Sequence, residues 1–99
     1  MSIKLKKLKN RDAQIPLEVV PFFEGLEAVV GSQKIKVGIR SHHGNSREPV
    51  VEIRHYDEMK KMLDLRFNNK DYIQTIHVLA NPSDIQQVKN FVDNYNSKR

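Results

Sequence analysis

The four histidines are the first residues to consider, because imidazole can bind a metal or move a proton near neutral pH. His42 and His43 are adjacent, and neighbours in an extended loop point to opposite sides, which disfavours a shared ion. His55 and His77 fall in separate predicted strands and could meet across a sheet, but no Asp or Glu is predicted beside them at ligand spacing. The sequence therefore predicts solvent-facing loop and strand histidines and no metal site.

Other motifs that carry chemistry are missing from the sequence. The chain has no Cys, which excludes disulfides, thiolate zinc sites, iron–sulfur clusters and a Cys nucleophile. Its glycines do not form a phosphate-binding loop, and no Gly-x-Ser-x-Gly nucleophile elbow is present. The acidic residues occur singly or beside Lys, without the carboxylate pair that acid–base catalysis needs. We therefore expect a protein that is not an enzyme and that binds no cofactor.

Basic residues are concentrated in two segments of the chain. The sequence has 17 Lys and Arg against 12 Asp and Glu, a net charge of +5. Residues 1–12 and residues 31–49 carry most of this excess, whereas residues 13–30 carry only acidic charges. If the two basic segments lie in one sheet, they present a basic face made of Lys4, Lys6, Lys36 and Arg40, extended by Lys34 and the loop residue Arg47.

A face of this kind attracts the phosphates of DNA or RNA. Neither basic segment contains an aromatic residue, so the stacking platform of a single-strand binder is missing. Lys also outnumbers Arg, and Lys acts as a point charge rather than as a fork for guanine. The sequence therefore predicts a small accessory protein that binds nucleic acid through phosphates with little sequence specificity. The alternative is that the lysines only protect exposed strand edges against aggregation.

A second hypothesis is an assembly module that binds no nucleic acid. The segment from Ile15 to Val30 is rich in large apolar residues, among them Val19, Val20, Phe22 and Phe23. These exceed what one short covering helix needs, and an exposed patch of them would pair subunits as a homodimer.

Chain length and hydropathy indicate one domain over residues 1–99. The apolar stretches are far shorter than the roughly 18 residues that a membrane span requires. The basic N-terminus is not followed by the apolar region of a signal peptide. We therefore expect a cytoplasmic protein that does not contact a membrane.

Hydrophobic periodicity predicts seven elements. The predicted strands are Ile3–Lys6, Lys34–Arg40, Pro49–His55 and Tyr72–Ala80, of which the second and third form a long-looped hairpin. The predicted helices are Pro21–Val30, a segment from the N-cap Asp57 to Asn69, and residues 82–96 behind Asn81. A pair of strands that turns at Glu24–Gly25 is the alternative to the first helix, because Val-rich segments also suit sheets.

This order predicts an α+β fold with an antiparallel sheet and helices on one face. It matches a ferredoxin-like βαββαβ arrangement with one additional C-terminal helix. If the first helix is instead two strands, the fold becomes a β-meander followed by α-β-α.

Overall fold

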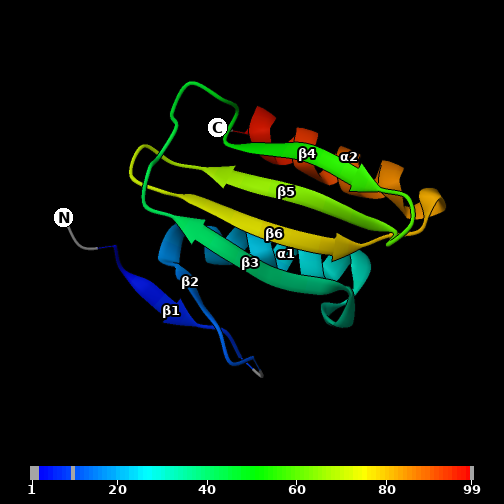
Figure 1. The fold of residues 1–99 in the computed structure, drawn as a ribbon, viewed down its shortest axis with the longest axis horizontal. Coiled ribbons are helices and arrows are strands. Elements are labelled where there is room, and N and C mark those ends of the chain that lie inside the picture. Colours follow the sequence, from blue (N-terminus) through cyan, green and yellow to red (C-terminus); the bar gives the residue numbers. More distant parts are fainter. Residues whose placement is uncertain (1–2, 10, 99) are drawn as a thin grey trace.

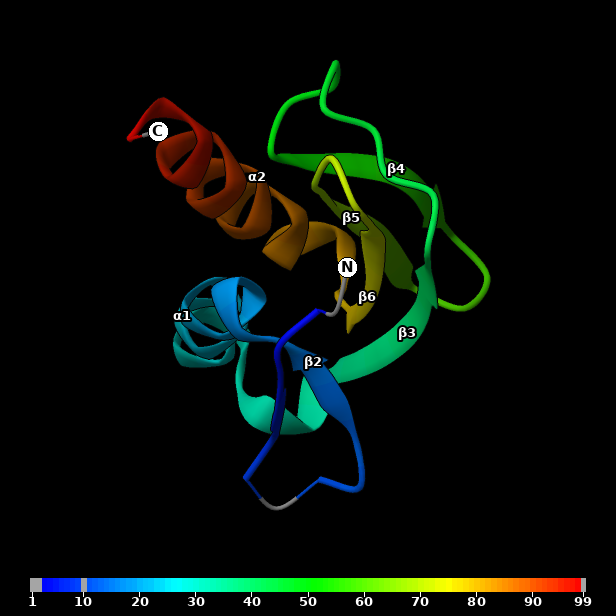
Figure 2. The ribbon, with the colours of Figure 1, turned by 90° about the vertical axis from the view of Figure 1, so that its left-hand side faces the viewer.

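A four-stranded antiparallel sheet forms the centre of the computed structural model, which describes residues 3–9 and 11–98. Its strands are β3 (Ile35–Ser41), β4 (Val51–Asp57), β5 (Met62–Asn68) and β6 (Ile73–Leu79). They lie in the order β3-β6-β5-β4 (Figure 1). Both α-helices cover one face of this sheet, and the other face is open (Figure 2). The chain is therefore a small α+β domain, as the sequence predicted.

Helix α1 (Val20–Val30) lies where the sequence predicted a helix rather than two strands. It follows the short 3₁₀ turn η1 (Leu17–Val19), and Pro21 occupies its first turn, where no N–H donor is needed. It ends at Gly31, whose φ of 94° is a backbone conformation that residues with a Cβ atom rarely adopt. A second 3₁₀ turn, η2 (Ser32–Lys34), then leads into β3.

Helix α2 (Pro82–Ser97) confirms the predicted C-terminal helix. Its Asn81 cap donates its backbone N–H to the Asp84 carboxylate at 3.3 Å, as in a capping box. Val88 and Val92 are buried along the predicted apolar stripe.

The core lies between the helices and the inner face of the sheet. Alternate residues of β5 and β6 are buried there, including Leu63, Leu65, Phe67, Ile76 and Val78. The apolar surplus predicted to pair subunits is also buried within one chain: Val19, Val20, Phe22 and Phe23 are at most 6% exposed. This segment therefore leaves no patch of those residues for a second subunit.

The topology differs from the sequence prediction in two ways. Strands β3 and β4 do not form a hairpin, because they occupy opposite edges of the sheet and the loop between them crosses its end. The predicted helix from Asp57 to Asn69 was wrong, since Met62–Asn68 is strand β5, paired with both β4 and β6. The strand order does not confirm the ferredoxin-like arrangement, nor is the alternative α-β-α ending found.

A tight turn between β4 and β5 replaces that helix. The Asp57 carboxylate accepts the backbone N–H groups of Met59 and Lys60, both at 3.0 Å. The hydrogen bond from Lys60 is the main reason that the pKa of Asp57 lies below its ordinary value. The last turn residue, Lys61, has a φ of 52°, which is uncommon for a residue other than glycine.

Two glycine substitutions in this turn are expected to act in opposite directions. Lys61→Gly removes the steric strain of a Cβ atom in the left-handed backbone conformation and should raise the free energy of unfolding by about 0.5–1 kcal/mol. Lys60→Gly, at a position without positive φ, should lower it by a similar amount because glycine gains entropy on unfolding. Urea unfolding of both variants checks this, and the same sign for both would contradict it.

Candidate nucleic-acid interface

The first basic segment forms a separate two-stranded ribbon. Strands β1 (Leu5–Lys7) and β2 (Gln14–Pro16) are antiparallel and pair only with each other. Leu8 and Ile15 are buried and attach this ribbon to the core. Lysines along it are exposed, namely Lys4, Lys6, Lys7 and Lys9. The ribbon therefore presents a row of solvated cations on an apolar anchor.

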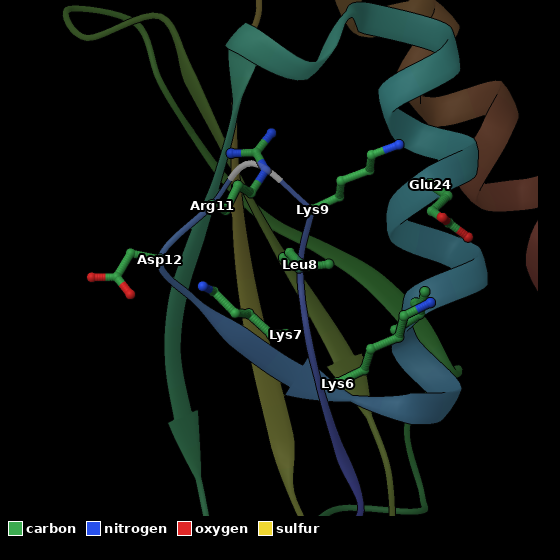
Figure 3. Close-up of a pocket in the computed structure, with 8 residues that line it drawn as sticks. Lys6, Lys7, Leu8, Lys9, Arg11, Asp12 and Glu24 are labelled. Atoms are coloured by element: carbon green, nitrogen blue, oxygen red, sulfur yellow. The ribbon is translucent and has the colours of Figure 1, made fainter.

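A basic groove lies between the ribbon and α1. It has a volume of about 850 Å³ and is lined by Lys6, Lys7, Leu8, Lys9, Arg11, Asp12, Val20 and Glu24. Figure 3 shows the side chains of Lys6 and Lys9 reaching toward α1, where Glu24 lies, while Lys7 extends the other way. Four cations against two carboxylates leave the lining positive, so the groove attracts an anion of matching size.

Arg11 fixes the end of the ribbon in place. Its guanidinium donates to the carbonyl oxygen of Ile35 at 2.8 Å and to that of Ser32. It also pairs with the Glu27 carboxylate at 3.1 Å and lies 5.0 Å from the ring centroid of Phe23. Because one planar group makes all these contacts, Arg11 positions the groove more than it offers free charge to a ligand.

The other end of the ribbon lies beside a partly buried polar contact. The Tyr72 hydroxyl donates to the Glu18 carboxylate, which joins η1 to the β5–β6 turn. Burial, followed by the nearby Glu18 carboxylate, raises the pKa of Tyr72 well above its ordinary value. Tyr72 thus remains a hydrogen-bond donor, and beside it Lys4 lines a second hollow of about 380 Å³.

The six residues predicted to share one basic face are not on one face. Lys4 and Lys6 belong to the ribbon, which is not part of the sheet that contains β3. Lys36 pairs with His77 and Arg40 with Gln74, so the bulge between Val37 and Arg40 turns the two cations to opposite faces.

The remaining predicted cations are also separated. Arg40 faces the helix side and donates to the carbonyl of Gln14 in β2, at 3.4 Å. Lys34 lies in η2, 3.8 Å from the Asp84 carboxylate. Arg47 is exposed in the β3–β4 loop. The structure gathers Lys7, Lys9 and Arg11 around Lys6 instead, which the basic run over residues 1–12 could have indicated.

The histidine prediction needs one correction. His42 and His43 are exposed in the β3–β4 loop, as expected. His77, however, does have an acidic neighbour: Asp64 of β5 lies directly opposite it, with Nδ1 and Oδ1 2.9 Å apart. Within residues 3–9 and 11–98, no three His, Asp or Glu side chains are grouped as a metal site.

No helix in the described part of the chain is long and apolar enough to cross a membrane. Comparison with protein-family models, with curated proteins and with solved structures found no match. The function of this chain is therefore inferred from its own residues and geometry.

Proposed function

We propose that this chain binds nucleic acid through its phosphates, with the ribbon and the basic groove as the contact surface. The observation that carries the proposal is the clustering of Lys6, Lys7, Lys9 and Arg11 in one groove. Lys4 continues this surface along the ribbon. Lys36 lies on the open face of the sheet. It follows Ile35, whose backbone carbonyl accepts a hydrogen bond from Arg11.

The chemistry of the groove favours phosphates over bases. Its lining contains no aromatic side chain on which a base could stack. Its free cations are lysines, which contact phosphate as point charges, because the single arginine is already bound to backbone carbonyls. Sequence specificity should therefore be weak.

A salt titration tests this proposal. Five lysines (Lys4, Lys6, Lys7, Lys9 and Lys36) that each neutralise one phosphate of duplex DNA would give a slope of log affinity against log salt near −4.5. Affinity should then fall by about 10²–10³ between ~50 and ~200 mM salt. Replacing Lys6 and Lys9 together with Ala should make the slope shallower by about two units, because each lost contact removes about one released counterion.

A matched double variant provides the control. Lys60 and Lys89 are exposed lysines on the β4–β5 turn and on α2, so replacing both with Ala removes the same charge away from the groove. Equal loss of affinity in both double variants would mean that only net charge matters. That result, or no binding at ~50 mM salt, would overturn the proposal.

A further inference from the structure

The open face of the sheet carries a polar row that crosses all four strands. Lys36 of β3 lies opposite His77 of β6, His77 lies opposite Asp64 of β5, and Asp64 lies opposite His55 of β4. Directly opposed side chains of antiparallel strands point to the same face. The helices cover the other face (Figure 2), so this row faces away from the core.

Asp64 and His77 form a defined pair within this row. Nδ1 of His77 and Oδ1 of Asp64 are 2.9 Å apart. Both atoms are shielded from solvent, and neither has hydrogen-bond geometry with any described group, so the pair is a close electrostatic contact. When the imidazole is neutral, this carboxylate selects the tautomer with its proton on Nδ1, and Nε2 then keeps a lone pair that can accept a hydrogen bond.

Gly38 allows the imidazole to lie in this position. A Cβ added at residue 38 would stand 2.9 Å from Nε2 of His77 and 2.9 Å from Cγ2 of Thr75. The ring thus reaches from Asp64 on one side to the backbone of β3 on the other. Any larger residue at position 38 would displace it. The His77 side chain is 30% exposed, so a ligand on the open face of the sheet can reach the imidazole.

The row places a hydrogen-bond acceptor beside a cation. Nε2 of His77 accepts, and the Lys36 ammonium is carried by the residue directly opposite. The complementary ligand has a hydroxyl donor next to an anion. In RNA, each ribose has a 2′-hydroxyl beside its 3′-phosphate, whereas DNA has the phosphate without the hydroxyl.

We propose that His77, oriented by Asp64 and assisted by Lys36, binds the 2′-hydroxyl of RNA, so that the chain prefers RNA to DNA. This inference rests on the proposed function, because phosphate contacts at the ribbon bring the strand to the protein. The two surfaces are adjacent at the start of β3, where Arg11 of the ribbon binds the carbonyl of Ile35, the residue before Lys36.

Two single-stranded oligonucleotides with identical bases test the inference. One is RNA, and the other is DNA with 2′-deoxyuridine in place of thymidine, so the two differ only in the 2′-hydroxyl. Wild-type protein should bind the RNA about three- to tenfold more tightly, the range of one neutral hydrogen bond. His77→Phe keeps a ring over Gly38 but removes the acceptor. It should bind both oligonucleotides with the affinity that wild type has for DNA.

Two further variants separate the roles in the row. Asp64→Asn should reduce the preference for RNA, because the fixed tautomer is lost, whereas Lys36→Ala should weaken binding of RNA and DNA together. Urea midpoints close to that of wild type establish that these variants are folded. Equal wild-type affinity for the two oligonucleotides, or an RNA preference that survives His77→Phe, would overturn the inference and leave phosphate binding intact. No binding to either oligonucleotide would overturn the proposed function as well.

Discussion

Replacing Phe22 with alanine is expected to lower the free energy of unfolding by about 3–5 kcal/mol, the usual cost of emptying a buried aromatic site. Phe22 is fully buried. Its ring centroid lies 6.0 Å from that of Phe67, 5.4 Å from Phe91 and 5.1 Å from Tyr95. One side chain thus joins α1 to α2 and to β5. Small domains are stable by about 5–15 kcal/mol, so this variant should be close to unfolding at 37 °C.

Urea unfolding followed by circular dichroism measures this loss. Met59→Ala is the control, because Met59 is 96% exposed and its truncation should change stability by less than about 0.5 kcal/mol. Phe22→Leu should lie between the two, since it keeps most of the buried apolar volume. A Phe22→Ala variant as stable as Met59→Ala would contradict the described core.

The elements that the sequence predicted correctly are those with two agreeing signals. Helix α2 has both an apolar stripe and a cap at Asn81 followed by Pro82. Helix α1 has the stripe, Pro21 in its first turn and Gly31 at its end. Burial alternates over all seven residues of β6, but in β3 only from Ile35 to Val37, before the bulge. Local chemistry and hydrophobic periodicity favour the same secondary structure in each case, and the tertiary contacts do not change it.

The wrong helix over residues 57–69 shows where such signals are ambiguous. Met59, Met62, Leu63 and Phe67 recur at steps of three and four, but Leu63, Leu65 and Phe67 also alternate, and the alternating set is the one that is buried. Asp57 suggested a helix cap. Its carboxylate does accept two backbone N–H groups, within a turn between strands, which is the same local chemistry in another structure.

That error also concealed the Asp64–His77 pair. Asp64 on a helix has no reason to meet His77, whereas Asp64 on β5 lies directly opposite it. The predicted basic face failed for a related reason. Simple alternation places Lys36 and Arg40 on one face of a strand, and only the bulge between Val37 and Arg40 separates them. Bulges depend on pairing with a distant strand, so a single sequence does not reveal them.

Replacing Arg11 with alanine is expected to affect stability and binding together. The variant leaves the carbonyls of Ile35 and Ser32 and the Glu27 carboxylate without their present partner. The side chain of Arg11 is 20% exposed, so water replaces these bonds only in part. Loss of several charge-assisted hydrogen bonds should lower the free energy of unfolding by about 2–4 kcal/mol. Arg54→Ala is the matched control, since its ion pair with Glu52 is 3.7 Å long and the Arg54 side chain is 46% exposed, so the pair contributes at most about 1 kcal/mol.

The same substitution should reduce affinity for duplex DNA more than the loss of one charge can explain. Arg11 holds the ribbon against α1 and β3, and without it Lys6, Lys7 and Lys9 no longer line one groove. We expect the salt slope of Arg11→Ala to become shallower by more than one unit, compared with about one unit for a single phosphate contact. Arg11→Lys tests the reason, because it restores the charge without the planar fork that reaches two carbonyls. Full recovery of binding in Arg11→Lys would show that Arg11 acts as a cation alone; recovery of less than half of the lost slope would show that it acts by positioning the lysines.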